Sequence, residues 1–247
     1  SIINALEHAG IALSCSVKIK WIDTTNLTDA NVAESLDDVD GIIVPGGFGT
    51  RGAEGKITCI KYARENNLPY LGLCFGFQMA VIEFARNVCG LARANSTEIE
   101  PDCPEPVIDV LPEQKEIEGL GGNMRLGGRD VELKAKTMAS ELFGGTSSVR
   151  MRFRHRYEVD PRYIERLEEA GLVFSGKAPN QPIMQILELP SHPYFLGTQA
   201  HPCLTSRPLR PQPMFVGLVA AAMQKRYPKE KSSDCMKTVQ RVYSGTD

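Results

Sequence analysis

The sequence predicts an α/β fold, with a mostly parallel central sheet flanked by helices and a small additional β-rich portion. In the first hundred residues, short apolar runs alternate with segments of helical spacing, which is the pattern of parallel strands joined by helices. After about residue 100 the pattern changes to PDCPEPVIDVLP, GLGGNMRLGG and the alternating run RMRFRHRYEV. These stretches indicate loops and additional β-structure.

The elements expected along the chain are short. The segments with apolar residues at helical spacing are 2–13, 55–66, 77–90 and 214–226. The apolar or alternating runs expected as strands are 17–23, 41–44, 68–73, 183–189 and 194–200. Together they predict a single domain over residues 1–226, followed by a polar tail over 227–247 that we expect to be poorly ordered.

The composition is that of an ordinary globular protein, with 42% apolar and 23% charged residues among 247. A formal net charge of −2 gives no reason to expect nucleic acid or an anionic membrane as a partner. The longest apolar run, 215–223, is too short to span a bilayer. Seven cysteines without a CxxC pair favour free thiols in a reducing compartment, so we expect a cytoplasmic protein.

One cysteine, Cys74 in LGLCFGFQ, stands at an expected strand-to-helix junction with a glycine two residues away on each side. The unpaired N–H groups and the positive dipole end of a helix N-terminus favour a thiolate. Gly72 and Gly76 permit the close backbone contacts of a sharp corner. The pattern is that of a nucleophile elbow with sulfur in place of oxygen, whereas a lone cysteine is more commonly a small buried hydrophobe.

Other groups around this corner are candidates for the same chemistry. The N–H of Phe75 begins the helix after Cys74, and that of Gly47 lies in PGGFG, which follows another strand. Both strands would end at one edge of a parallel sheet, so the two N–H groups are candidates for an oxyanion hole. A thiol nucleophile needs a base. Among four histidines we favour His201, because it also directly follows a strand, whereas the others lie on the first helix, in the arginine run and in a turn.

Several segments resemble the class I glutamine amidotransferases, and in particular the glutaminase domains of the CTP synthase family. The segment 72–76 together with the distant His201-Pro202 is similar to the nucleophile and histidine motifs of that class. The segments with the finer resemblance are PGGFGTRG, ENNLPYLGLCFGFQMAVIEFARN, ANSTE, GGNMRLG, RHRYEV, HPYFLGTQAHP and SRPLRPQP. They occur in the family's order over nearly the whole chain and stop only at the tail.

The resemblance implies hydrolysis of L-glutamine to glutamate and ammonia. Cys74 would form a γ-glutamyl thioester, and His201 would protonate the departing ammonia and then activate water. The oxyanion hole would be formed by the N–H groups of Gly47 and Phe75. The substrate-binding residues that the resemblance implies are Gly47, Phe75, Gln78, Glu98 and Arg156. A carboxylate suits the α-ammonium group of glutamine, and an arginine fork suits its α-carboxylate.

The resemblance also implies a partner. In the complete family enzyme, ammonia reaches a synthase domain that aminates UTP to CTP with ATP and Mg, and GTP is an allosteric activator. No cofactor and no metal are implied for the glutaminase domain itself. The chain has no G-x-x-x-x-G-K-[ST] phosphate loop, so we expect that it cannot make CTP alone. It opens in a helix where the family's domain begins with a strand, and we therefore expect either a fragment or an unobserved first strand.

The third position of the catalytic triad departs from the family. The family reads HPE where this chain reads His201-Pro202-Cys203, so the glutamate that orients the imidazole is absent. Loss of the orienting acid costs about 10⁴ in a serine protease, but a cysteine–histidine pair depends on it less. Two hypotheses follow: a working glutaminase, or a catalytically weakened glutaminase-like regulatory module. A third, a γ-glutamyl peptidase, is less favoured because Glu98 and Arg156 suit free glutamine.

Overall fold

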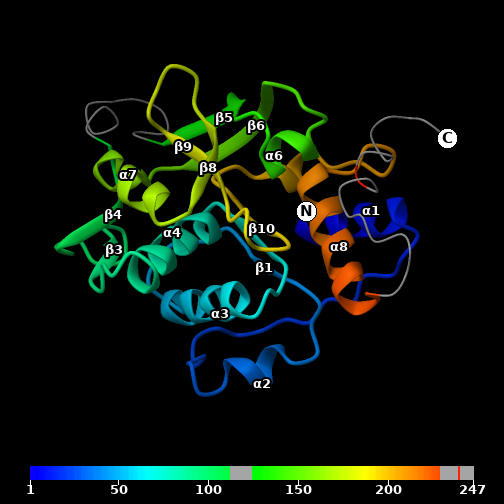
Figure 1. Ribbon diagram of the computed structural model, residues 1–247, viewed down its shortest axis with the longest axis horizontal. Coiled ribbons are helices and arrows are strands. Elements are labelled where there is room, and N and C mark those ends of the chain that lie inside the picture. Colours follow the sequence, from blue (N-terminus) through cyan, green and yellow to red (C-terminus); the bar gives the residue numbers. More distant parts are fainter. Residues whose placement is uncertain (112–123, 229–238, 240–247) are drawn as a thin grey trace.

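The structure, a computed structural model, describes residues 1–111, 124–228 and 239 (Figure 1). The helices are α1 (Ile2–Ala12), α2 (Val32–Leu36), α3 (Ala53–Glu65), α4 (Phe75–Asn87), α6 (Met138–Leu142), α7 (Pro161–Glu169), the 3-10 helix η1 (Pro202–Leu204) and α8 (Pro213–Arg226). The strands are β1 (Ile42–Val44), β2 (Tyr70–Leu73), β3 (Ala94–Ser96), β4 (Glu105–Asp109), β5 (Arg125–Leu133), β6 (Ser148–His155), β7 (Glu158–Val159), β8 (Val173–Lys177), β9 (Met184–Glu188) and β10 (Phe195–Thr198). Nearly all of the expected tail lies outside the described residues.

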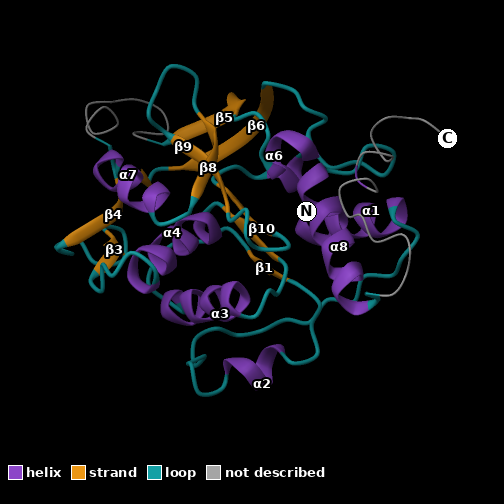
Figure 2. Cartoon of the chain, viewed as in Figure 1, coloured by secondary structure: helices purple, strands orange, loops and turns teal. Residues whose placement is uncertain are grey.

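Seven strands form one mixed sheet in the order β1-β2-β10-β9-β8-β5-β6 (Figure 2). β2 pairs in parallel with β1 and with β10, while the other four pairs in this sheet are antiparallel. A second sheet has the order β3-β4-β7. The predicted α/β fold class, with a sheet flanked by helices and a further small β-rich portion, is confirmed. The sheet is mixed, however, and not mostly parallel as expected, since its parallel pairs are the two that β2 makes. Short connections, such as the one between β8 and β9, join antiparallel strands, whereas parallel strands need a long crossover.

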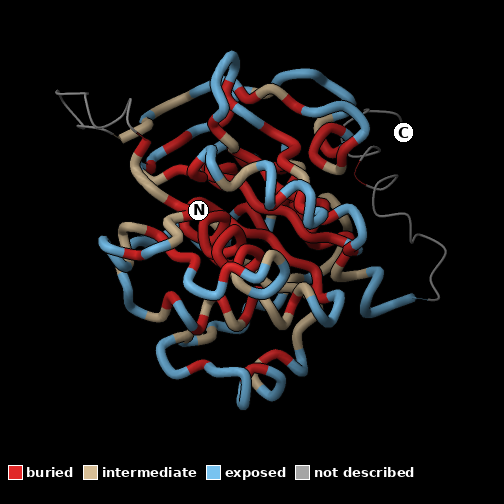
Figure 3. Tube along the Cα trace, turned by 60° about the vertical axis from the view of Figure 1, so that its left-hand side comes forward, coloured by how far each residue is buried: buried red, intermediate tan, exposed pale blue. Residues whose placement is uncertain are grey.

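Helices cover both faces of the large sheet. α3 and α4 lie on one face, and α1, α6 and α8 lie on the other (Figure 1). Successive side chains of β2 point to opposite faces, so Tyr70 packs with α3 and α4 whereas Leu71 and Leu73 pack with α1 and α8. The buried segments gather between these layers, in the centre of the molecule (Figure 3). The core therefore encloses β2 from both sides and holds its carboxyl end in place.

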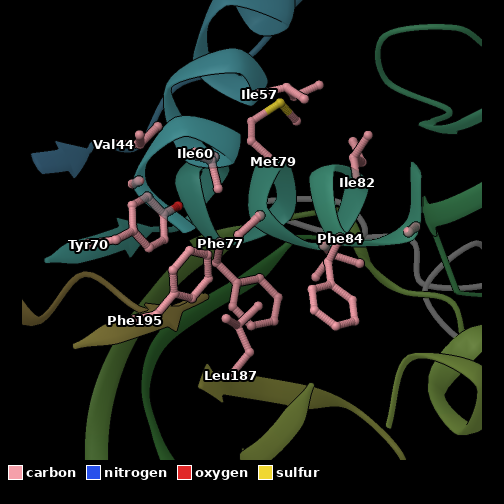
Figure 4. Close-up of a cluster of buried hydrophobic side chains, with 14 of the residues drawn as sticks. Val44, Ile57, Ile60, Tyr70, Phe77, Met79, Ile82, Phe84, Leu187 and Phe195 are labelled. Carbon is pink, nitrogen blue, oxygen red and sulfur yellow. The ribbon is translucent and has the colours of Figure 1, made fainter. Parts of the chain in front are cut away.

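α4 is buried nearly all round, because it lies between the sheet and α3. Every residue from 75 to 85 is buried. Figure 4 shows Phe77 and Phe84 turned toward the strands, with Phe77 beside Phe195, and Met79 turned toward α3. A helix enclosed in this way cannot shift without disturbing close-packed side chains on two sides. The residue at its N-terminus, Cys74, is thus held by packing as well as by the chain.

Most of the elements expected from the sequence are confirmed with ends within a few residues, but the strand predicted over 17–23 is wrong. In the described part of the chain no strand pairs with this segment, and the side chains of Ile19 and Trp21 are 40% and 78% exposed. Alternation alone does not make a strand, because a ladder needs a neighbouring backbone and one covered face. β1 pairs with β2, and the segment 17–23 does not join that ladder.

The glycine-rich stretch expected as a loop also differs in part. Residues 119–123 lie outside the described residues, but Arg125 to Gly128 form the first part of β5 and pair antiparallel with β6. The long ladder with β6 supplies backbone hydrogen bonds that outweigh the low strand propensity of glycine. No helix in the described part of the chain is long and apolar enough to cross a membrane.

Candidate active site

Three chain segments leave the sheet side by side at the carboxyl ends of the parallel strands. In the register, Val44 of β1 lies opposite Gly72, and Thr198 of β10 lies opposite Leu73. The next residues are therefore the PGGFG loop, Cys74 and the segment 199–201. Open α/β sheets bind their ligands at this edge.

Cys74 has a backbone conformation that non-glycine residues rarely adopt, with φ 51° and ψ −99°. Such conformations cost free energy and persist where the surroundings enforce them. A Cβ added at Gly72 would overlap the Tyr70 hydroxyl, and one added at Gly76 would overlap the Val44 carbonyl oxygen. Both glycines are thus required for the close approach that turns β2 sharply into α4. The corner is built as a nucleophile elbow.

The Cys74 thiol is 6% exposed and has polar neighbours on several sides. Its sulfur donates to the Arg154 carbonyl oxygen at 3.8 Å and accepts from Nε2 of Gln199 at 3.7 Å. Burial raises the pKa of the thiol to about 12, while hydrogen bonds from the Phe75 backbone and the Gln199 side chain act in the opposite direction. The thiol is therefore neutral near pH 7, with its proton directed at a carbonyl oxygen.

His201 lies beside this thiol, across Gly46. A Cβ added at Gly46 would be 3.1 Å from Cε1 of His201 and 3.6 Å from the Cβ of Cys74. A methyl group at this one position would therefore contact both the ring and the cysteine. Burial lowers the pKa of His201, and a hydrogen bond to the Arg154 backbone opposes that effect. Nε2 of His201 is buried and has no hydrogen-bond partner among the described residues. The imidazole is thus neutral near pH 7 and has one nitrogen available.

Gly47 and Phe75, the expected oxyanion-hole residues, are neighbours. A Cβ added at Gly47 would lie 3.7 Å from Cδ1 of Phe75. Phe75 is the first residue of α4, and its backbone N–H acts on the Cys74 sulfur in the direction that lowers the pKa of the thiol. The N–H groups at the start of a helix have no partner within the helix, so this one is available to an anion near the sulfur.

Of the expected substrate contacts, Glu98 and Gln78 lie close to the thiol and its surroundings. Oε1 of Glu98 accepts from the Gly49 backbone at 3.1 Å, and the charge of Glu98 raises the pKa of both Cys74 and Tyr157. Gln78 is 3% exposed and donates Nε2 to the Tyr157 carbonyl at 3.1 Å, while its Oε1 has no partner among the described residues. One acceptor of Gln78 is therefore free.

Arg156, the expected partner of the substrate carboxylate, directly precedes Tyr157. Its side chain is exposed and forms no hydrogen bond or ion pair with another residue in the part of the chain that the structure describes. Its guanidinium group is consequently free to bind an anion. The site thus has a carboxylate, and a guanidinium that no described residue pairs, on segments that meet at Tyr157.

Cys203, at the third triad position, is not hydrogen-bonded to the His201 ring. It lies in η1, is 7% exposed, and its sulfur accepts from the Ser1 hydroxyl at 3.5 Å. Its side chain belongs to the hydrophobic cluster on the α1 and α8 face of the sheet. The position that holds the orienting acid in the family therefore contributes packing here.

Two features of the site were not predicted. Gln199 contacts the Cys74 sulfur; its position two residues before His201 near the end of a strand is a sequence signal that could have revealed it, because alternate residues of a strand share a face. The other is the fully buried Glu158, whose Oε1 accepts from Nε2 of His155 at 2.8 Å and from Nε of Arg125 at 2.9 Å. No local pattern predicts that contact.

Comparison with known proteins defines the class first. Residues 1–221 match the family Glutamine amidotransferase class-I. The chain belongs to the class I glutamine amidotransferase family, and its sheet, elbow and histidine agree with that membership.

Within the family, the chain is similar to CTP synthases. It is 56% identical over 230 residues to the CTP synthase of Archaeoglobus fulgidus, covering 93% of this chain and 43% of that protein. It is 51% identical over 230 residues to that of Staphylococcus carnosus, covering 93% and 42%. A solved structure of the Trypanosoma brucei CTPS glutaminase domain with bound acivicin superimposes with a TM-score of 0.85 and 35% identity, covering 90% of this chain and 87% of that one.

These findings confirm the resemblance to the glutaminase domain of CTP synthase. The chain spans less than half the length of the curated relatives that it matches, 43% for the Archaeoglobus fulgidus protein.

Proposed function

We propose that this chain hydrolyses L-glutamine to glutamate and ammonia through a thioester on Cys74. The observation that carries the proposal is the strained corner at Cys74, with the His201 ring on the other side of Gly46. A buried cysteine that only filled space would need neither the left-handed backbone nor a neutral imidazole next to it. Membership of the class I glutamine amidotransferase family supports the same reaction.

In the proposed mechanism, the His201 ring takes the proton of the Cys74 thiol as the sulfur attacks the side-chain amide carbon of glutamine. The carbonyl oxygen becomes an oxyanion that accepts from the N–H groups of Gly47 and Phe75. The C–N bond then breaks, and the imidazolium gives its proton to the leaving nitrogen, which departs as ammonia. Water next gives a proton to His201 and attacks the thioester carbon, so that glutamate leaves and the thiol regains its proton.

The same proposal assigns the substrate contacts. Glu98 would bind the α-ammonium group of glutamine, and the exposed guanidinium of Arg156 would bind its α-carboxylate. The free Oε1 of Gln78 is an acceptor for a substrate N–H. All three lie on segments that meet at Tyr157 or at the PGGFG loop. A free amino acid with both α-groups is thus the substrate class that these charges favour.

For the ammonia we propose a partner. The relatives that share most of this chain are CTP synthases, and the chain corresponds to 43% of the length of the Archaeoglobus fulgidus protein. We infer that ammonia is delivered to a synthase domain that aminates UTP to CTP with ATP and Mg, and that GTP is an activator of that assembly. Cytoplasmic location suits such a role.

A second candidate function is a catalytically weakened, glutamine-binding regulatory module. It is favoured by one observation: Nε2 of His201 has no partner among the described residues, while the thiol at the third triad position contacts Ser1 instead. An imidazolium without a carboxylate is less stable, so each turnover would be slower. This candidate predicts glutamine binding with little ammonia release.

The test is ammonia release from glutamine by the purified chain. The wild-type chain should release ammonia, and Cys74→Ala should release none, whereas Cys89→Ala, which alters a half-exposed thiol just beyond the other end of α4, should retain activity. A thiol-directed glutamine analogue should label Cys74. Equal ammonia release from Cys74→Ala, or labelling at Cys203 instead, would contradict the assignment. Tight glutamine binding without release would favour the regulatory module.

A further inference from the structure

A buried chain of amide groups leads from the substrate-binding segment to the thiol. The Tyr157 carbonyl accepts from Nε2 of Gln78 at 3.1 Å, and the same nitrogen donates to Oε1 of Gln199 at 3.4 Å. Nε2 of Gln199 then donates to the sulfur of Cys74 at 3.7 Å. Gln199 is fully buried and Gln78 is 3% exposed, so water does not compete for these contacts.

The chain of amide groups can be oriented in one way, and this orientation determines whether a hydrogen-bond donor or an acceptor faces the sulfur. A carbonyl can only accept, so Tyr157 requires the NH₂ group of Gln78 to face it. That NH₂ group can only donate, so it requires the oxygen of Gln199 to face it. The remaining group of the Gln199 amide, its NH₂, must therefore point at the sulfur. A reversed Gln199 amide would place an oxygen against the sulfur and a donor against a donor.

We propose that Gln199 is a further catalytic residue, whose side-chain amide stabilises the Cys74 thiolate by a hydrogen bond, and that Gln78 keeps this amide turned toward the sulfur. This inference rests on the proposed glutamine hydrolysis for its role in turnover. When the proton passes to His201, the sulfur becomes an anion in a buried site, where an unpaired charge is costly. The Phe75 N–H also favours the thiolate, since it lowers the pKa of the thiol.

The two donors have different tasks as the reaction proceeds. The Phe75 N–H lies at the start of α4 and belongs to the proposed oxyanion hole, so the substrate oxygen becomes its acceptor as the new bond forms. Gln199 approaches the sulfur from β10, and its oxygen is held by Gln78. It is therefore the donor that stays with the sulfur. Gln199 also donates to the sulfur when the thioester is hydrolysed and the sulfur becomes the leaving group.

Removal of the Gln199 donor should change the reaction rate of Cys74 in two opposing ways. A hydrogen bond to a charged group contributes about a tenfold change in the equilibrium between thiol and thiolate. A thiolate that has lost such a donor is intrinsically more nucleophilic, which recovers about half of that change on a logarithmic scale. Removing the donor should consequently slow the reaction of Cys74 about threefold below the pKa of the thiol.

The test is the rate at which iodoacetamide alkylates Cys74 in the whole chain without glutamine, followed on the Cys74 peptide by mass spectrometry at pH 8. Gln199→Leu should slow it about threefold. Gln199→Glu, which places a carboxylate against the sulfur, should slow it at least tenfold. The Cys89 peptide is an internal reference for reagent and folding. Gln185→Leu is the matched control, since Gln185 is an equally buried glutamine on the neighbouring strand whose side-chain amide has no partner among the described residues.

An alkylation rate unchanged in folded Gln199→Leu, or lowered equally in Gln185→Leu, would overturn the proposal. If Gln199→Leu does not fold, Gln78→Leu tests the same chain, because loss of its donor frees the Gln199 amide to rotate; it should slow alkylation in the same direction by a smaller factor, and no change would overturn the proposal. Since no glutamine is present, a slowed thiol in a protein that releases no ammonia would support the hydrogen bond while contradicting the proposed hydrolysis.

Discussion

The imidazole of His155 and the carboxylate of Glu158 form a buried pair, with Nε2 2.8 Å from Oε1. Arg125 donates to the same oxygen at 2.9 Å, from the strand paired with β6. The preceding residue, Arg154, provides the carbonyl oxygen to which the Cys74 thiol donates. The hydrogen bonds of Glu158 therefore stabilise the end of β6, where the Arg154 carbonyl accepts from the Cys74 thiol.

We expect Glu158→Leu to destabilise the fold by about 3 kcal/mol, because it leaves a mostly buried guanidinium and a buried imidazole without their shared partner. Urea unfolding monitored by circular dichroism measures this. Arg150→Ala is the matched control on β6, the strand that carries His155; it removes an ion pair with Asp130 that is largely exposed, and should cost at most about 0.5 kcal/mol. Equal losses in the two variants would show that Glu158 has no special structural role.

Restoring the acid at position 203 should accelerate turnover. The resting thiol is neutral, since burial raises its pKa to about 12, so an imidazolium must form during attack and a carboxylate would stabilise it. We expect Cys203→Glu to raise kcat for ammonia release at least about tenfold, a fraction of the 10⁴ known for serine enzymes. Cys203→Gln has nearly the same shape without the charge and should not raise kcat. No gain from Cys203→Glu would contradict position 203 as the place from which an acid acts on His201.

A methyl group at Gly46 should disturb the reacting pair. The added carbon would lie 3.1 Å from Cε1 of His201 and 3.6 Å from the Cβ of Cys74, so the ring must move. A contact at this distance requires the ring to shift by a few tenths of an ångström. Because displacement of a reacting group by about 1 Å costs roughly a hundredfold in rate, we expect Gly46→Ala to lower kcat by roughly tenfold. Its melting temperature should be close to that of the wild type, because the loop is exposed. A fully active Gly46→Ala chain would rule out the tight arrangement of His201 and Cys74.

Whether the sequence predicts a feature depends on how far apart in the chain the interacting residues lie. The corner at Cys74 depends on neighbours two residues away, so Gly72 and Gly76 indicate it directly. The segment 17–23 has the alternation of a strand, but strand formation requires a partner that its own residues do not specify. The contact of Cys203 with Ser1 joins residues far apart in the chain, and it arises because α1 packs against η1. Gln199 and Cys74 meet for the same kind of reason, through the register of β2 and β10.

The pH dependence of hydrolysis should show a single acid limb. The base must be neutral, and burial lowers the pKa of His201 from its ordinary 6.5. Activity should therefore persist as the pH falls from 8 to 6.5 and decline only below that value. Measurement of kcat/KM between pH 5 and 8 reports the free enzyme. A midpoint at or above pH 6.5 would contradict a buried, neutral His201 as the base.

Stability should also fall in acid, through a second buried histidine. His192 bonds the Ala63 carbonyl through Nε2 at 3.0 Å and accepts from the Tyr194 backbone through Nδ1 at 3.2 Å, so a proton on Nδ1 would face a donor. Burial lowers the pKa of His192 as it does that of His201. Below pH 6.5 the unfolded chain consequently binds more protons than the folded one, and the free energy of unfolding decreases as the pH drops toward the folded pKa. Urea unfolding at pH 7.5, 6.5 and 5.5 should show this decrease. In His192→Gln the free energy of unfolding should depend less steeply on pH, and the dependence that remains should be due to His201. An unchanged dependence would exclude His192 as a cause of the acid destabilisation.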